Sequence, residues 1–265
     1  MKKITIPELL KKKSRAEKIS MLTAYDYSFA KILDQNGIDI LLVGDSLGMV
    51  VQGRRNTLAV TLEEMIYHSR CVSRATRQAH LVCDMPFLSY QASLDEAVKN
   101  CGLVMKKGHA ESVKLEGGEE LAPLIARLKN VGIPVMGHIG LKPTHVHLMG
   151  GYKIQGRDAQ GERQLLNDAK ALEKAGIYAL VLEGIPAKLA AKISKSLKIP
   201  TIGIGSGAGC DGQVLVIYDL LGLYQDLKPK FVRRYAELHQ TVSEAIGNYI
   251  RDVQSGKFPS EEESF

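Results

Sequence analysis

The stretch IDILLVGDSLGMVVQG, residues 38–53, decides the fold. Its first half runs through apolar residues without alternation and then reaches Asp45. A strand of this kind is buried on both faces, and in soluble proteins such strands belong to parallel sheets that helices cover. The stretch therefore predicts a buried parallel strand with an acidic side chain at its carboxyl end.

Strand-like and helix-like segments alternate along the rest of the chain, as they do in repeated βα units. An open doubly wound sheet is the poorer interpretation, because no G-x-G-x-x-G turn follows the first strand. The 265 residues also match the length of about 250 that a (β/α)₈ TIM barrel needs. We count seven clear strands and a weaker eighth within residues 210–222; the clear ones are 18–26, 38–45, 80–86, 112–118, 133–141, 178–185 and 199–207.

The predicted barrel is a single domain over residues 1–265, with additional helices at both ends of the chain. A basic amphipathic helix precedes the first strand, and residues 231–256 read as one or two helices after the last. Four glycines are expected to end helices in the left-handed conformation: Gly37, Gly108, Gly132 and Gly176.

The composition is that of an ordinary soluble globular protein, with 45% hydrophobic and 24% charged residues. We predict a cytoplasmic location, because no apolar run reaches the roughly 18 residues of a membrane span and no secretory signal is recognisable. Four scattered cysteines without a CxxC pair fit buried thiols. The net charge of +6 is spread over predicted helix surfaces without a binding motif, so we expect neither a nucleic-acid nor a membrane partner.

Acidic side chains stand at the ends of three consecutive strands. The carboxyl ends of barrel strands share one face, so Asp45, Asp84 and Glu116 would converge there. Without a partner they would repel one another, whereas a divalent cation would hold them together. Oxygen ligands suit Mg²⁺. A helix cap or a lysine pair is the better explanation for any one acid, but a poorer one for three.

Other polar side chains end neighbouring strands. Lys114 shares a strand face with Glu116 and could bind a carboxylate or an oxyanion, or simply pair with that acid. Glu183 closes an apolar strand, where partial desolvation would raise its pKa and suit a general base; an ion pair at the rim is the alternative. His138 could donate to a substrate or be a satisfied rim histidine.

Three glycine-containing segments follow the strands. The loops over residues 48–61 and 148–161 are long for βα connections, which is typical of lids and binding loops, and their arginines suit closure over an anion. The stretch GIGSGAG, residues 203–209, offers backbone N–H groups to a phosphate, yet a tight turn explains its glycines equally well.

An ordered set of motifs covers nearly the whole chain and resembles the ketopantoate hydroxymethyltransferase family. The motifs are TAYDYSFA (23–30), LLVGDSLGMVVQG (41–53), VKLEGG (113–118), GHIGL (137–141), GGYKIQGR (150–157), VLEGIP (181–186) and TIGIGSG (201–207). The resemblance implies a Mg²⁺-dependent (β/α)₈ barrel. Its reaction would be the first committed step of pantothenate synthesis, in which 5,10-methylenetetrahydrofolate donates a hydroxymethyl group to 3-methyl-2-oxobutanoate and 2-dehydropantoate forms.

The resemblance also implies roles for individual residues and an assembly. Glu183 would be the general base, and Glu116 would be a third metal ligand, direct or through water, beside two aspartates. The metal-binding aspartates would be Asp45 and Asp84, and the keto acid would contact Asp45, Ser46, Asp84, Lys114 and His138. The family forms homo-oligomers, often decamers.

Two other interpretations remain open from the sequence. An enzyme of the phosphoenolpyruvate mutase and isocitrate lyase type would use a similar Mg²⁺ site on the same fold, and MKKGHAE (105–111) superficially resembles its KKCGH motif. A non-enzymatic scaffold would use the acids only as helix caps and in ion pairs.

Overall fold

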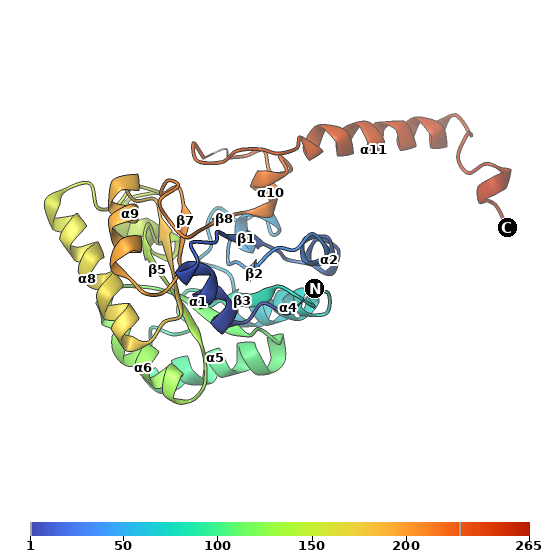
Figure 1. Cartoon of the computed structure of the whole chain (residues 1–265). Helices are drawn as coiled ribbons and strands as arrows, with labels where there is room; N and C mark the ends of the chain where they lie inside the picture. Colours follow the sequence, from blue (N-terminus) through green and yellow to red (C-terminus); the bar gives the residue numbers. More distant parts are fainter. Residues whose placement is uncertain (1, 228) are drawn as a thin grey trace. The chain divides into compact units, whose positions relative to one another are not determined.

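The computed structural model describes residues 2–227 and 229–265. The chain divides into two compact units, Met1–Val216 and Ile217–Phe265. The first unit holds every strand (Figure 1). A division into compact units does not decide how many domains the chain has, so the single domain over residues 1–265 stays a prediction.

Eight parallel strands close into a barrel, which confirms the predicted (β/α)₈ fold. Each strand pairs with the next, and the weaker eighth candidate closes the ring by pairing with the first. The strands are β1 (Ile19–Thr23), β2 (Ile40–Val43), β3 (His80–Asp84), β4 (Ser112–Glu116), β5 (Val135–Gly140), β6 (Ala179–Glu183), β7 (Thr201–Ile204) and β8 (Gly212–Leu215).

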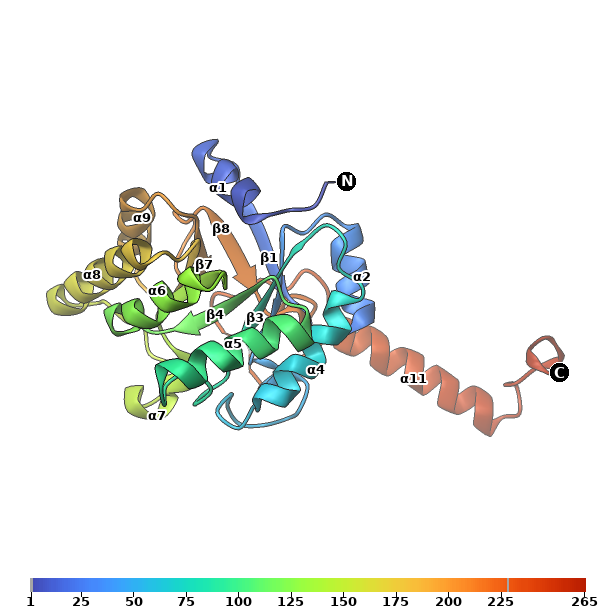
Figure 2. The same cartoon turned by 90° about the horizontal axis from the view of Figure 1, so that it is seen from below.

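Helices surround the strands, as Figure 2 shows. The outer layer consists of α2 (Tyr27–Gln35), α4 (Leu62–Ser73), α5 (Leu94–Gly108), α6 (Ala122–Asn130), α8 (Ala159–Ala175) and α9 (Ala187–Ser196). Shorter turns lie in the loops after the strands: α3 (Leu47–Val50), η1 (Glu119–Leu121), η2 (Pro143–His145) and α7 (Val146–Met149).

The predicted N-terminal helix is α1 (Ile6–Ser14), and it packs at the amino end of the barrel. Its Leu9 is fully buried in the same core cluster as Ile19 and Met21 of β1. Lys13 at the other end of α1 contacts Asp211, directly before β8, at 2.6 Å. These contacts place α1 against the amino-terminal side of the barrel.

Three of the four predicted helix-ending glycines, Gly37, Gly132 and Gly176, have positive φ as expected. The prediction for Gly108 is wrong, because it is the last residue of α5 and His109 takes the left-handed conformation instead. A Cβ at Gly108 would lie 3.1 Å from the Ser69 side chain of α4. This glycine is therefore needed for the close packing of two helices rather than for a cap.

The second unit contains α10 (Ile217–Leu220), α11 (Leu238–Gln254) and η3 (Glu261–Glu263). The predicted terminal helix over residues 231–256 therefore starts later than expected. The N–H of Tyr235 donates to the carbonyl of Leu220, and that of Leu238 donates to Leu221. These two bonds hold the segment before α11 against the end of α10. That segment is therefore not part of α11. No helix among the described residues is both long and apolar enough to cross a bilayer.

Asp34 of α2 fixes the entry to β3, the strand that ends in Asp84. Its side chain is only 3% exposed. It accepts hydrogen bonds at 2.8–3.1 Å from three successive backbone N–H groups, those of Arg77, Gln78 and Ala79. Buried backbone donors need a partner, so this one carboxylate satisfies the turn that leads into the strand.

We expect Asp34→Ala to lower the free energy of unfolding by about 3 kcal/mol, because hydrogen bonds to a charged acceptor are lost and buried donors are left unpaired. Asp95→Ala, on the exposed first turn of α5, is the matched control and should cost less than about 1 kcal/mol. Urea denaturation followed by circular dichroism measures both. Equal stability of the two variants would contradict the role given to Asp34.

Candidate active site

The predicted site residues converge at the carboxyl ends of β2 to β6. Asp45 and Ser46 follow β2, and the remaining ones end or lie within the next four strands: Asp84 in β3, Lys114 and Glu116 in β4, His138 in β5 and Glu183 in β6. Strand register places Asp84 beside Lys114 and Glu116 beside His138. Five of these side chains are buried, whereas that of Glu183 remains 18% exposed.

The ammonium group of Lys114 lies at the centre of the cluster. Its Nζ is 3.2 Å from Asp84 Oδ1, 3.8 Å from Glu116 Oε1 and 2.9 Å from His138 Nδ1. Burial alone would lower the pKa of Lys114, but the surrounding carboxylates outweigh it and the pKa is raised. Lys114 is therefore a permanently charged cation at neutral pH.

His138 connects the lysine with Glu183. Its Nε2 lies 3.2 Å from Glu183 Oε2, and its Nδ1 lies 3.5 Å from Glu116 Oε1. Burial and the Lys114 charge lower the pKa of His138, but its contacts with the two glutamates raise it further, so the net direction is upward. The short contact with the lysine fits Nδ1 as an acceptor, which leaves the proton on Nε2, facing Glu183.

Glu116 is the most firmly held acid of the cluster. Thr144 of η2 donates to its Oε2 through both the hydroxyl, at 2.5 Å, and the backbone N–H, at 3.1 Å. The Tyr90 hydroxyl bonds to both backbone groups of Glu116. Burial raises the pKa of Glu116, but contacts with His138 and Lys114 hold it well below the usual range. This carboxylate therefore stays ionised and balances the lysine charge.

Sequence reasoning missed Thr144 and Tyr90. Both come from loops, and each meets Glu116 across more than twenty residues of sequence. Neither residue stands at the carboxyl end of a strand, where polar side chains are expected from the sequence. No sequence signal could have identified them, because only the folded loop brings them to this acid.

Asp45 and Asp84 lie close together, and the nearby positive charge is too small to balance both carboxylates. The backbone N–H of Asp45 donates to Asp84 Oδ2 at 3.1 Å. Burial raises the pKa of both side chains, and the charge of Glu116 raises each further; Lys114 acts in the opposite direction. Asp84 Oδ1 is buried without a well-directed hydrogen bond. The pair is therefore suited to a cation.

A hard divalent ion such as Mg²⁺ fits this pair of oxygen donors. Within the described residues, no group of three histidine, cysteine or acidic side chains is arranged to hold a metal unaided. Asp45 and Asp84 would therefore share the ion with water or substrate oxygens, as Mg²⁺ sites commonly do. Ligation by Glu116, whose oxygens face Thr144 and His138, stays a prediction.

The two long loops lie over the same end of the barrel. Thr57, from the loop after β2, is buried and lies near Asp45. Met49 in the same loop meets Tyr152 of the loop after β5, with 3.6 Å between the Tyr152 hydroxyl and the Met49 sulfur. The loops predicted to close over the site therefore touch one another.

Ser46 and Ser206 have different surroundings. The Ser46 hydroxyl lies 2.8 Å from that of Tyr25, and its contact with a substrate stays a prediction. The buried Ser206 hydroxyl donates to the backbone carbonyl of Leu182 at 2.7 Å and so ties β7 to β6. Gly205 and Gly207 have positive φ. These features favour the tight-turn interpretation of GIGSGAG.

Comparison with known proteins identifies close relatives over the full length. The family model described as ketopantoate hydroxymethyltransferase matches residues 3–261. The 3-methyl-2-oxobutanoate hydroxymethyltransferase of Pelobacter propionicus is 55% identical, covering 100% of this chain and 98% of the relative. That of Carboxydothermus hydrogenoformans is 53% identical, covering 100% and 96%.

Solved structures with low sequence identity share the fold. A phosphonopyruvate hydrolase in complex with oxalate and Mg²⁺ has a TM-score of 0.64 at 12% identity, covering 98% of this chain and 93% of its own. Phosphoenolpyruvate phosphomutase from Streptomyces platensis subsp. rosaceus has a TM-score of 0.60 at 13% identity, covering 92% and 87%. At such identities the likeness is evidence of the barrel fold alone.

We expect Mg²⁺ binding to release protons. Because burial raises the pKa of Asp45 and Asp84 above their usual value, these groups hold protons to higher pH, and the ion has to displace them. Affinity should therefore rise with pH. Calorimetric titration with MgCl₂, in buffers of different ionisation enthalpy, measures the protons released.

Asp84→Asn should weaken Mg²⁺ binding at least 10-fold, because one anionic ligand is removed. Asp95→Asn, on the exposed surface of α5, is the matched control and should bind as the unmodified protein does. Binding that is independent of pH and unchanged in Asp84→Asn would show that the ion does not sit on this pair.

Proposed function

Because the chain belongs to the ketopantoate hydroxymethyltransferase family, we propose that it transfers a hydroxymethyl group from 5,10-methylenetetrahydrofolate to 3-methyl-2-oxobutanoate. The product would be 2-dehydropantoate, in the first committed step of pantothenate synthesis, and the expected location is the cytoplasm. The observation that carries the proposal is the contact chain Lys114–His138–Glu183, which lies against the paired aspartates.

The reaction begins with removal of the proton on C3 of the keto acid, which is weakly acidic because the carbonyl is adjacent. Mg²⁺ held by Asp45 and Asp84, with Glu116 as a further ligand, would supply Lewis acidity toward the keto acid oxygens. Lys114 adds a second fixed positive charge 3.2 Å from Asp84, where it stabilises negative charge developing on a bound substrate.

Glu183 is the base in this proposal because it alone of the four acids in the cluster keeps appreciable exposure. His138 Nε2 faces Oε2 of this carboxylate, so the other oxygen can take up the C3 proton. Their 3.2 Å contact is not a well-directed hydrogen bond here, and such contacts often tighten only when substrate binds. The electrons of the C3–H bond form the enolate.

The enolate carbon would then form a new bond to the methylene carbon of the folate as the bond from that carbon to N10 breaks, and N10 would take up a proton. Water would displace the remaining bond to N5, giving its hydroxyl group to the product and its proton to N5, so that tetrahydrofolate leaves. The loops that meet at Met49 and Tyr152 would cover the site during this step. Exclusion of bulk water limits loss of the enolate through reprotonation.

The phosphoenolpyruvate mutase and isocitrate lyase alternative has less support. Its expected motif would have to contribute to the site, but MKKGHAE ends α5 and precedes β4, at the amino end of that strand. His109 of this stretch is the cap residue of α5. The non-enzymatic scaffold is also disfavoured, since the relatives are named as transferases.

The C3 proton of 3-methyl-2-oxobutanoate should exchange with deuterated water in the presence of the protein and Mg²⁺, without any folate. We expect chelator to abolish the exchange, and Glu183→Gln to slow it by 10²- to 10⁴-fold, the usual contribution of a general base. Proton NMR of the keto acid follows the reaction.

Glu162→Gln is the matched control for Glu183, because Glu162 is half-exposed on α8 and its only ion pair in the described structure is with Lys192. This variant should catalyse exchange of the C3 proton at the rate of the unmodified protein. Asp84→Ala should keep the fold and lose the exchange. Exchange that persists in Glu183→Gln at the unmodified rate would rule out the base proposed here.

We further propose that the protein forms a homo-oligomer, a decamer as the family resemblance implies. Within its own unit, α11 has no buried residue. It presents an exposed apolar stripe with helical spacing, made of Val242, Ile246, Tyr249, Ile250 and Val253. An uncovered apolar stripe of this kind is typical of an association surface.

Ile246→Glu should reduce the mass of the assembly in solution, because it places a charge in the centre of the α11 stripe. Light scattering after size-exclusion chromatography measures that mass. Ser243→Glu, at a neighbouring position outside the stripe, is the control and should leave it unchanged. An unaltered mass in Ile246→Glu would exclude this stripe as the contact surface.

A further inference from the structure

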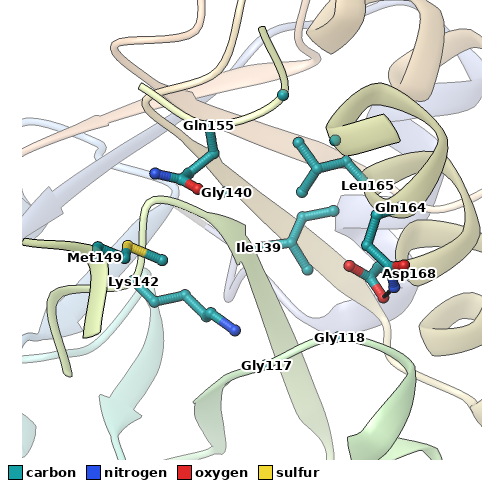
Figure 3. A pocket seen from close by; sticks show the side chains of 12 residues that line it. Gly117, Gly118, Ile139, Gly140, Lys142, Met149, Gln155, Gln164, Leu165 and Asp168 are labelled. Atoms are coloured by element: carbon teal, nitrogen blue, oxygen red, sulfur yellow. Dashed lines mark hydrogen bonds between the residues drawn. The ribbon is translucent and has the colours of Figure 1, made fainter. Parts of the chain in front are cut away.

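A cavity of about 180 Å³ lies next to the catalytic cluster and has no role in the chemistry above. Its floor is formed by Gly117 and Gly118, which directly follow Glu116, and by Ile139 and Gly140, which directly follow His138 (Figure 3). The rest of its wall comes from the loop after β5 and the first half of α8. The long loop over residues 148–161 therefore covers a second space as well as the barrel mouth.

The cavity has a buried acceptor on one side. Asp168 of α8 is 7% exposed. Both hydrogen bonds that its side chain accepts among the described residues, from the Glu119 N–H and from Gln164 Nε2, end on Oδ1 at 3.0 Å. Oδ2 is left to accept further hydrogen bonds.

A cation lines the same cavity as this acid. Lys142, two residues before Thr144, extends its side chain into the space (Figure 3). Its charge acts on Asp168, although burial still raises the pKa of that acid overall. The cavity thus offers both an acceptor and a donor.

Part of the wall of the cavity is apolar. Ile139, Met149 and Leu165 contribute the apolar surface. A Cβ added at Gly118 would lie 2.3 Å from Asp168 Oδ1, and one at Gly156 would lie 2.6 Å from a Leu165 methyl group. Glycine at these positions lets the backbone approach the Asp168 and Leu165 side chains of the wall closely.

We propose that this cavity binds the 2-amino-4-oxopyrimidine ring of the reduced folate, an inference that rests on the proposed function. One edge of that ring carries the 2-amino group, N3–H and the 4-oxo oxygen in sequence. The first two donate to Asp168, and the third accepts from Lys142. A cavity of about 150 Å³ accommodates benzene, so one substituted six-membered ring is of suitable size and the rest of the folate lies outside.

The position of the cavity agrees with the transfer reaction. Gly140 in its wall is paired in the sheet with Glu183, the proposed base. The backbone N–H of Gln155, also in the wall, donates to the carbonyl of Gly184 at 2.9 Å. A ring held here therefore places the remainder of the folate beside the residue at which the enolate forms.

Other classes of ligand suit the cavity less well. An anion such as phosphate would be repelled by the buried Asp168, and a metal ion would be repelled by Lys142. A purely apolar ring would leave the free oxygen of Asp168 without a partner. A neutral planar ligand with two donors next to an acceptor is repelled by neither charge, and it gives the free oxygen of Asp168 a partner.

Calorimetry with tetrahydrofolate, and with its analogue in which methyl replaces the 2-amino group, tests this assignment. The unmodified protein should bind tetrahydrofolate about 10- to 100-fold more tightly, because hydrogen bonds to a buried charge are lost with the analogue. Asp168→Asn should weaken tetrahydrofolate binding by a similar factor and reduce the preference between the two compounds to within about 3-fold.

If Asp168 had a merely structural role, Asp168→Asn would weaken binding of both compounds alike and preserve the preference for tetrahydrofolate. Lys142→Met should weaken both compounds, since both keep the 4-oxo group. Lys170→Met, on the exposed side of α8, is the matched control and should behave as the unmodified protein. Equal binding of the two compounds by the unmodified protein, or a preference that survives in Asp168→Asn, would overturn the proposal.

The C3 exchange experiment keeps this proposal separate from the proposed function, because it uses no folate. Absence of exchange in the unmodified protein, with an Asp168-dependent preference intact, would overturn the catalytic proposal and support the ring site. Normal C3 exchange together with equal binding of tetrahydrofolate and its methyl analogue would support the catalytic proposal and overturn the ring site.

Discussion

The excess of buried negative charge at the carboxyl end of the barrel is the constraint on which the site depends. Asp45, Asp84 and Glu116 are all nearly inaccessible to solvent, and one lysine stands among them. Ion pairs are costly to bury unless further hydrogen bonds complete them. Glu116 has those bonds, whereas the two aspartates have raised pKa values and an unsatisfied oxygen. The shortage of positive charge is thus confined to the aspartate pair.

The barrel can maintain this arrangement because strand geometry fixes each side chain. Lys114 and Glu116 are two residues apart in β4 and point into the barrel together. Leu115 between them faces the other way and is fully buried, so backbone shifts are resisted by the surrounding core. Positions on neighbouring rigid strands give a more accurate site than loops alone could provide.

Much of the fold and the acidic cluster could be predicted because both follow from local patterns. Unbroken apolar runs identify the strands, and the residue after each run is placed at the common end of the barrel by topology. The contributions of Thr144 and Tyr90 could not be predicted, because they depend on how a loop folds back. The same is true of Gly108, where a neighbouring helix, and not the local cap pattern, decides the conformation.

The whole segment between β5 and α8, residues 141–158, links the two halves of the proposed reaction. It begins with Lys142 in the ring cavity, continues through Thr144 on Glu116, and extends to Tyr152 against the other loop. Movement of this loop would therefore alter the cavity and the support of Glu116 together. Since the contacts of Glu116 help position Lys114 and His138, a folate ring seated against Lys142 would also stabilise the arrangement that holds the base. Binding of the folate and binding of the keto acid would be coupled if both ligands favour the same ordered state of this one segment.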